Sequence, residues 1–282
     1  MSSKNMSLNR ALRAKNANEA FAETLKAVRN SGHFVASDDS ASIGSGRSTT
    51  EIINFSMEVE SPRDRLILNP QRPMNIVTSV ARFVWMMSGN NRLEDIAFYE
   101  PKVSKFTDDN LTVPGSDYGM RMFQPRPGLD QISGILQELR KRKQSRRATV
   151  AVFHPEDAVR QGSADIPCTF GLNFLIRDGQ LYSTTIMRSN NAVQLLPFNL
   201  FEFSMLAEVI AVEAGVELGP MTHLALSMHV YENDIASVDS IVEGARKAPA
   251  SLMEAMPGDP LKKINHLAQM EARLRHRERI AL

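Results

Sequence analysis

The chain lacks several features that would assign it to whole classes of protein. Cysteine and tryptophan each occur once in 282 residues. A single cysteine excludes an internal disulfide, which fits a reducing compartment. No apolar run reaches the roughly 18 residues that a membrane-spanning helix needs, and the N-terminus has no hydrophobic signal core. We therefore expect a cytoplasmic protein without a membrane partner.

An excess of charge of one sign is also missing. The 33 Lys and Arg residues nearly balance the 32 Asp and Glu residues, so the net charge gives no argument for a nucleic-acid or membrane partner. The histidines show no spacing that predicts a metal site, and there is no glycine-rich phosphate loop. A hydrophobic fraction of 43% is enough for a sizeable core. This composition fits an enzyme without identifying its reaction.

Residues with useful chemistry are concentrated between positions 166 and 234. The lone Cys168 opens this stretch, and Asp178-Gly179 between two apolar runs predicts a two-residue hairpin turn. Counting outward from this turn places Cys168 opposite Ser189, with Arg188 one step away. Facing residues in an antiparallel pair lie about 5 Å apart, and nearby positive charge lowers the pKa of a thiol. The pattern thus predicts an activated thiolate at Cys168.

The rest of the chain alternates helical and extended patterns. Periodicity predicts helices at 18–31, 74–88, 93–99 and 129–142, and strands at 51–60 and 148–153. Residues 38–50 are rich in Ser, Gly and Asp and predict a loop. A basic amphipathic helix is expected near the C-terminal end, around 271–279. This mixture predicts an α+β protein.

Several polar residues have a structural interpretation as well as a functional one. Arg47 fits a solvated loop residue, and Tyr118 fits a packed ring with a bonded hydroxyl. Asn199, with an acid three residues later, fits a helix N-cap. His229 fits a buried core histidine. The basic run ending in Arg146-Arg147 fits a solvated helix terminus or a nucleic-acid patch. The residues alone leave these alternatives open.

A set of short motifs resembles the catalytic half of the thymidylate synthase family. The motifs are Pro167-Cys168, Arg188-Ser189, Pro197-Phe198-Asn199 and His229-x-Tyr231, preceded by Ser145-Arg146-Arg147. Tyr118-Gly119 and the segment from Trp85 to Gly89 match more loosely. The resemblance spans about residues 17–240, and its motifs are specific in combination although each is weak alone.

The resemblance implies a fold and an assembly. We expect a single α+β domain at 17–240, with a mixed, largely antiparallel sheet covered by helices on one face. The other sheet face would join a second copy in a homodimer. Residues 1–16 would form a flexible N-terminal segment, and residues 241–282 a C-terminal helical extension.

The resemblance also implies transfer of a one-carbon unit from 5,10-methylenetetrahydrofolate, as cosubstrate, to C5 of a pyrimidine nucleotide monophosphate. The first candidate reaction is dUMP to dTMP through a covalent Cys168 adduct. The implied catalytic residues are Cys168, Tyr118 and Arg188. The implied nucleotide-binding residues are Arg47, Arg146, Arg147, Ser189, Asn199, His229 and Tyr231, with Arg146 and Arg147 reaching the partner's phosphate. Asn191 and Phe106 would face the folate, and no metal is implied.

Three departures from the family pattern keep other functions open. Arg82 stands where the family has a glutamate that helps protons move on the pyrimidine ring; Glu94 or Glu100 would then take over, or the chemistry differs. Asn191 and Leu195 replace a usual aspartate and glycine, and the basic C-terminal helix replaces a hydrophobic tail. The alternatives are a 5-hydroxymethylase for dUMP, dCMP or CMP, and an inactive relative that binds nucleotide or RNA. Asn199 favours uracil over cytosine, because its amide matches O4 and N3–H.

Overall fold

The computed structural model of the chain describes residues 12–37, 47–160, 162–249 and 251–276. Its centre is one sheet. The strands are β1 (Leu12–Ala14), β2 (His33–Val35), β3 (Thr49–Val59), β4 (Thr149–Ala151), β5 (Thr169–Arg177), β6 (Gln180–Met187), β7 (Asn190–Asn191) and β8 (Glu217–Tyr231). They lie in the order β1-β3-β8-β6-β5-β4, with β2 paired to β3 and β7 to β8. The long β3–β8 pairing is antiparallel and β6–β8 is parallel, so the predicted mixed sheet is confirmed.

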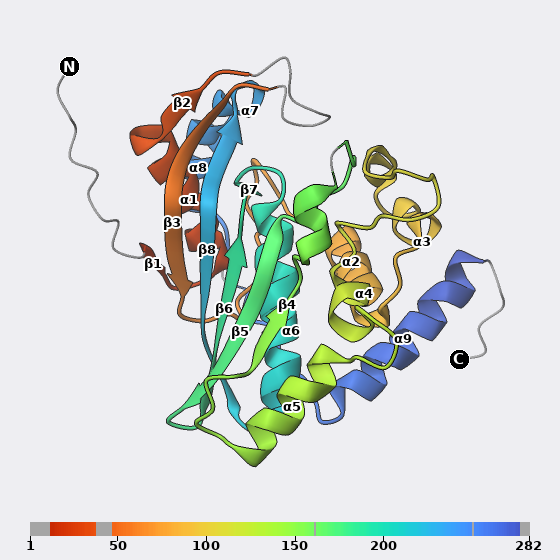
Figure 1. Cartoon of the computed structure of the whole chain (residues 1–282). Helices are drawn as coiled ribbons and strands as arrows, with labels where there is room; N and C mark the ends of the chain where they lie inside the picture. Colours follow the sequence, from red (N-terminus) through yellow and green to blue (C-terminus); the bar gives the residue numbers. More distant parts are fainter. Residues whose placement is uncertain (1–11, 38–46, 161, 250, 277–282) are drawn as a thin grey trace.

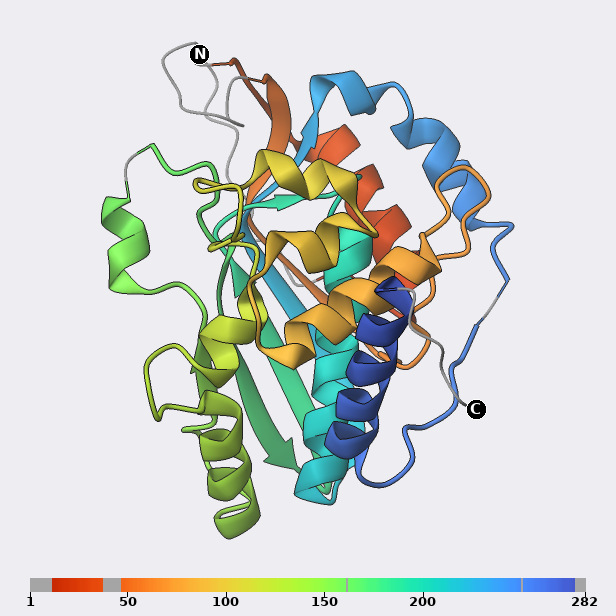
Figure 2. The same ribbon diagram turned by 90° about the vertical axis from the view of Figure 1, so that its right-hand side faces the viewer.

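Helices cover one face of this sheet. They are α1 (Ala17–Ser31), α2 (Ile76–Ser88), α3 (Leu93–Ala97), α4 (Tyr118–Phe123), α5 (Gln131–Lys141), α6 (Leu196–Ala214), α7 (Glu232–Ile235), α8 (Val238–Ala245) and α9 (Pro260–Arg275), with short 3-10 helices η1 (Pro101–Lys105) and η2 (Pro155–Val159). Figure 1 shows α6 lying along the sheet, with α2, α4 and α9 on its far side. Helix α6 is apolar on nearly all sides, as expected for a helix enclosed between layers. In the view of Figure 2, α9 crosses in front of α6 next to α2.

Alternation along the strands explains why only one sheet face is covered. On β6, Leu181, Ser183 and Thr185 are buried against the helices, whereas Tyr182 and Ile186 remain exposed. Similar exposed apolar side chains occur on neighbouring strands of this second face, namely Ile53, Phe170 and Leu226. The helices of the described ranges therefore leave an apolar sheet face open to solvent.

The four predicted helices are present as α1, α2, α3 and α5, and the two predicted strands as β3 and β4. Side-chain caps explain where three of these helices begin: Asn16, Asn75 and Asp130 each accept a hydrogen bond from the N–H three residues later. Among the described residues, no helix is long and apolar enough to cross a membrane.

Three predicted segment boundaries differ from the structure. Residues 1–11 and 38–46 lie outside the described residues, so most of the expected N-terminal segment and loop cannot be compared. Residues 12–16 are not a flexible extension, because Leu12–Ala14 pair with β3 and Asn16 caps α1. The expected boundary at 240/241 falls inside α8, which packs against α1. The predicted C-terminal helix begins earlier than expected, at Pro260, and packs against α2 and α6.

Candidate active site

A β-bulge determines what lies beside the lone thiol. Strands β5 and β6 pair in the predicted register over most of their length, but the register shifts by one residue between Thr169 and Gly171. Cys168 consequently faces Arg188, whose backbone N–H donates to the Cys168 carbonyl at 2.7 Å. The predicted pairing of Cys168 with Ser189 is therefore wrong, since a bulge adds a residue that counting from the turn does not include.

The bulge has a local cause in the neighbouring strand. The carbonyl of Phe170 accepts hydrogen bonds from both the Val152 and Phe153 N–H groups, so two residues of one strand face one of the other. At Gly171 the chain passes so close to β4 that a Cβ would lie 2.3 Å from the Val150 carbonyl oxygen. A side chain at Gly171 would push the two strands apart, and glycine permits the contact.

Arg188 holds the segment before the thiol. Its Nε donates to the Pro167 carbonyl at 2.8 Å and its Nη2 to the Ile166 carbonyl at 3.0 Å. Cys168 itself is partly buried. Burial raises the pKa of the Cys168 thiol above its ordinary value, Arg188 opposes that rise, and the Asp165 carboxylate adds to it. The prediction of a thiolate activated at rest is thus wrong for this state of the chain, because desolvation outweighs the guanidinium.

Asp165 fixes the same segment from the other side. Its carboxylate accepts from the backbone N–H groups of Gly115 and Ser116 at 2.7 and 2.6 Å and from the Ser116 hydroxyl at 2.8 Å. These bonds connect the segment before Cys168 to the turn that precedes α4. The thiol is therefore positioned by two side chains, Asp165 and Arg188, that bond to backbone groups on opposite sides.

Tyr118 is the first residue of α4 and is buried near the thiol. Its ring stacks on Phe203 of α6, with 6.0 Å between centroids and an interplanar angle of 19°. Burial raises the pKa of the Tyr118 hydroxyl, and the nearby Cys168 adds to the rise. The following Gly119 permits this placement, because a Cβ there would lie 1.9 Å from the Met86 carbonyl oxygen of α2.

A second group of predicted residues continues from Arg188 along the sheet. The Ser189 hydroxyl lies 3.4 Å from Nδ1 of His229 on β8. The His229 ring contacts Tyr231 edge to face at 5.2 Å, and the Arg47 guanidinium lies 5.3 Å from the centre of the Tyr231 ring. Burial lowers the pKa of His229, so its imidazole is neutral at pH 7. The structure thus brings Arg188, Ser189, His229, Tyr231 and Arg47 into one continuous row.

Asn199 lies inside α6 and not at its N-cap. The helix begins at Leu196 after Leu195, and the Asn199 N–H already donates to the Leu195 carbonyl. The N-cap interpretation is therefore wrong: Pro197 is tolerated in the first turn, where a backbone N–H is not required. The buried Asn199 side chain accepts a hydrogen bond from Nδ2 of Asn190 at 2.9 Å.

A buried cluster of charges occupies the place where the family has a glutamate. Nε of Arg82 donates to Glu202 at 2.5 Å, and Nη1 donates to Glu100 at 2.8 Å. The guanidinium also lies 5.2 Å from the centre of the Phe198 ring. Of the two acids expected to compensate for Arg82, Glu100 contacts it, whereas Glu94 is exposed and pairs elsewhere.

Glu202 is the residue of this cluster that sequence reasoning missed. It lies on α6 three residues after Asn199, and its side chain is 3% exposed. Burial raises the pKa of the Glu202 carboxyl, and Arg82 partly offsets that rise. The sequence did carry a signal, because a carboxylate between Phe201 and Phe203 in a largely apolar helix requires a buried partner.

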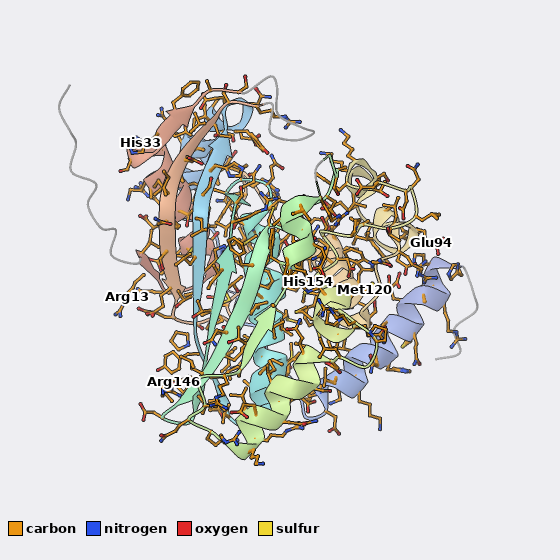
Figure 3. The ribbon with its side chains drawn as sticks, viewed as in Figure 1. Arg13, His33, Glu94, Met120, Arg146 and His154 are labelled. Atoms are coloured by element: carbon orange, nitrogen blue, oxygen red, sulfur yellow. The ribbon has the colours of Figure 1, made fainter. Side chains whose placement is uncertain are left out.

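The remaining predicted residues are Arg146, Arg147, Phe106 and Asn191, and of these Asn191 adjoins the row, because it pairs with His229 in the β7–β8 register. Arg146 and Arg147 are exposed before β4, and Figure 3 shows Arg146 at the end of β4 opposite His154. Cys168 lies toward the His154 end of this strand, since Ala151 pairs with Gly171. Phe106 is 42% exposed after η1 and has no described contact with Cys168. Asn191 is buried, and its Oδ1 accepts from the Gln194 N–H at 2.8 Å.

The chain was compared with known proteins. The thymidylate synthase family model matches residues 19–272. The chain is 26% identical over 243 residues to a putative thymidylate synthase of Methanosarcina acetivorans and 28% over 238 residues to that of Methanosarcina mazei; each match covers 84% of this chain and 96% of the relative. It is 30% identical over 185 residues to the deoxyuridylate hydroxymethyltransferase of Pseudomonas phage M6, covering 64% of this chain and 52% of that protein.

The fold is an α+β domain with one mixed sheet covered by helices, and the family match assigns it to a class. The chain belongs to the thymidylate synthase family, as the motifs predicted. Its relatives include proteins named for both outcomes of one-carbon transfer. Within the described residues, no group of His, Cys, Asp and Glu side chains could hold a metal ion.

Proposed function

We propose that the protein transfers a one-carbon unit from 5,10-methylenetetrahydrofolate to C5 of a pyrimidine nucleotide monophosphate. The candidate reaction that we place first is the conversion of dUMP to dTMP. The observation that carries this proposal is the lone thiol of Cys168 facing Arg188 at a bulged strand end. Family membership gives the class of chemistry, and the buried amide of Asn199 supports uracil as the base.

The row from Arg188 to Arg47 supports binding of the sugar and phosphate. Guanidinium groups match phosphate oxygens in geometry and charge, so Arg188 and Arg47 would bind the phosphate with the Ser189 hydroxyl between them. His229 and Tyr231 would bond the sugar 3'-hydroxyl. Because His229 is neutral, it can donate one hydrogen bond without adding charge near the phosphate.

The residues beside the base support covalent catalysis. The Cys168 thiolate would add to C6 of the pyrimidine and make C5 nucleophilic. Methylenetetrahydrofolate supplies the carbon that C5 attacks and, in the methylating reaction, a hydride. Tyr118 would assist removal of the C5 proton. Glu202 would supply the carboxylate that the family has at the position of Arg82, because burial raises its pKa toward the range useful for proton transfer.

The fate of the transferred carbon distinguishes methylation, the first candidate reaction, from hydroxymethylation, the second. Hydride addition to the exocyclic methylene carbon gives dTMP and dihydrofolate, whereas water addition gives a hydroxymethyl nucleotide and tetrahydrofolate. In both cases the Cys168 thiolate leaves C6, which breaks the covalent adduct and restores the ring double bond. Two observations favour the second reaction: similarity to phage hydroxymethyltransferases, and the Asn191 amide, whose Oδ1 already bonds Gln194. Phe106 offers an exposed apolar surface that a flat pterin would cover in either reaction. We place methylation first, because uracil recognition is the better-supported feature.

A covalent trapping experiment tests the proposal. The protein is incubated with 5-fluoro-dUMP and methylenetetrahydrofolate, and its intact mass is measured. We expect a ternary adduct on the wild-type chain and none on the Cys168→Ser variant, with activity reduced by at least about 1,000-fold. A wild-type chain that binds dUMP without forming the adduct would be an inactive binder. Product analysis with dUMP, UMP, dCMP and CMP then distinguishes dihydrofolate formation from hydroxymethylation.

A homodimer with shared sites would explain the position of Arg146 and Arg147. Both arginines lie beyond the end of β4 that is remote from Cys168, and the open apolar sheet face offers a surface for a second copy. Mixing an Arg146→Ala, Arg147→Ala chain with a Cys168→Ala chain should restore part of the activity, since one of the two sites would then be intact. Equal inactivity before and after mixing would show that each chain works alone.

A further inference from the structure

A chain of buried amide and imidazole groups leads away from Asn199 into the core. Nδ2 of Asn190 donates to Oδ1 of Asn199 at 2.9 Å, and Oδ1 of Asn190 lies 2.9 Å from Nε2 of His223. All three side chains are buried, with His223 fully enclosed. Asn190 lies on β7, His223 on β8 and Asn199 on α6, so three elements contribute one residue each. The proposed mechanism assigns no role to His223 or Asn190.

The protonation state of His223 follows from which of the neighbouring groups can donate a hydrogen bond and which can only accept one. Nε2 of His223 carries the proton that Asn190 Oδ1 receives, because in the other tautomer a buried Nδ1–H would have no acceptor among the described residues. Burial lowers the pKa of His223 to about 4, so the ring is neutral at pH 7 and Nδ1 is a bare lone pair. Nδ1 indeed has no hydrogen-bond partner among the described residues. The direction of both hydrogen bonds is therefore fixed from His223 outward.

This direction determines which way the Asn199 amide faces. Its Oδ1 receives one N–H from Asn190 and keeps a second lone pair, while its Nδ2 makes no hydrogen bond to a described residue. Turning the amide by half a turn would set the Nδ2 of Asn199 against the Nδ2 of Asn190, two donors without an acceptor. A buried donor without a partner costs about 1–3 kcal/mol.

We propose that His223 and Asn190 are positioning residues that hold the Asn199 amide in the orientation that reads uracil and rejects cytosine. The inference rests on the proposed function, in which Asn199 contacts the base. Uracil offers an N3–H donor to the free lone pair of Oδ1 and an O4 acceptor to Nδ2. Cytosine offers the reverse pattern and would require the turned amide. Specificity is thus set by residues that do not touch the base.

Asn190→Asp is the sharpest variant, because it keeps the shape and removes the donor. A carboxylate at this position still accepts from His223 but can bond Asn199 only through the Nδ2 of that residue. The Asn199 amide should therefore turn and present the pattern that matches cytosine. His223→Leu is the second variant: without the Nε2 donor, Asn190 is free to turn, and the preference should weaken without reversing.

Thr185→Val provides the matched control. Thr185 pairs with His223 in the β6–β8 register, and its buried hydroxyl has no partner among the described residues. Valine has nearly the same shape, so this variant disturbs the same part of the core without changing His223, Asn190 or Asn199. Each variant is first checked for a cooperative thermal transition.

The measurement is calorimetric binding of dUMP and of dCMP to the full chain, expressed as the ratio of the two Kd values. We expect the wild-type chain to favour dUMP by about tenfold or more. Asn190→Asp should shift the ratio toward dCMP by at least about tenfold, His223→Leu should bring it toward one, and Thr185→Val should leave it unchanged.

Folded Asn190→Asp and His223→Leu variants that keep the wild-type ratio would overturn the positioning role of His223 and Asn190 while leaving the proposed function intact. If Asn190→Asp does not fold, the His223→Leu ratio decides alone. A wild-type chain that binds neither nucleotide would overturn both proposals together.

Discussion

The two ends of the candidate site are built in different ways. The end proposed to bind the phosphate, called the phosphate end, runs from Arg188 through Ser189 and His229 to Arg47; its side chains lie on adjacent strands or the loop before them, and it retains solvent contact. The end proposed to bind the base, called the base end, lies around Asn199 and Glu202; it is buried and is assembled from α2, α6, β7 and β8. The phosphate end matches the family motifs; at the base end Asn199 matches them and Arg82 does not. Under the proposed function, the phosphate contacts are kept while the charged groups beside the reacting ring are rebuilt.

The rebuilt end carries the larger energetic penalty. Arg82, Glu202 and Glu100 are removed from water together, and a buried pair is stable only if each charge keeps its partner. At the phosphate end, Arg188 bonds two backbone carbonyls and makes no ion pair with a described carboxylate. It is free to accept a negatively charged ligand. The contrast predicts that mutations at the base end destabilise the fold, whereas mutations at the phosphate end mainly weaken binding.

The largest expected effect is the loss of Glu202. Glu202→Ala leaves Arg82 buried with only Glu100 as its partner, and we expect a loss of about 3 kcal/mol in the free energy of unfolding. Urea unfolding monitored by circular dichroism measures this change. The exposed pair between Arg246 and Glu243 is the matched control, because Glu243→Ala should cost less than about 1 kcal/mol.

A double variant separates structure from chemistry in the same cluster. Arg82→Met with Glu202→Leu replaces both buried charges by apolar side chains, and Glu100, whose side chain is 24% exposed, can be hydrated in place of its lost partner. Most of the lost stability should therefore return while activity stays low. A double variant as unstable as Glu202→Ala would show that the cavity, and not the unpaired charge, causes the loss. A stable double variant with full activity would remove Glu202 from the proton transfer.

The contrast also explains how much could be predicted from the sequence. Residues close together in sequence or on strands flanking a turn were placed correctly, because hairpin pairing and alternation are local rules. The helices and the placement of Arg188 near Cys168 follow from those rules, whereas the mixed sheet and the row from Arg188 to Tyr231 were implied by the family resemblance. What failed was one residue of register at Gly171, where the close approach of β4 is a tertiary contact that no count from the Asp178-Gly179 turn contains.

Buried polar partners were missed for a different reason. Glu202, Asn190 and His223 find their partners in elements that are distant in sequence, and only packing brings them together. The thiol of Cys168 illustrates the same limit. The nearby Arg188 was predicted correctly, but the burial that raises the pKa of the Cys168 thiol was not. Charge can be read from sequence, whereas desolvation requires the fold.

The next prediction tests that desolvation directly. Burial raises the pKa of Cys168 above its usual range, so the free thiol should be mostly protonated at pH 7 and 8. Because the thiolate is the reactive form, the rate of iodoacetamide alkylation should keep rising as the pH increases from 7 to 9, without a plateau. Intact-mass kinetics follow the reaction, and Cys168→Ser is a complete control, since the chain has no other cysteine. A plateau below pH 8 would restore the activated thiolate that the sequence predicted.

The smallest expected effect compares a buried carboxylate at the start of α4 with an exposed one. Asp117 caps α4 by accepting from the Met120 N–H at 2.7 Å, and burial raises its pKa to about 8. A carboxyl with a raised folded-state pKa binds its proton more tightly in the folded chain than in the unfolded one. Its contribution to stability is complete below the unfolded pKa near 4 and is lost as the pH rises toward 8.

Asp117→Asn should therefore flatten the dependence of stability on pH. The amide keeps the cap and has no proton to lose, so Tm should change little at pH 5 and rise by about 2–4 °C at pH 8.5. Asp109→Asn is the control of opposite sign: its exposed carboxylate accepts from the Leu111 and Thr112 N–H groups, which lower its pKa. Stability from such a group is present above the unfolded pKa, so this variant should lose stability at pH 8.5. If both variants shift Tm in the same direction at pH 8.5, burial does not control the Asp117 carboxyl, and the start of α4 is more open to water than its packing indicates.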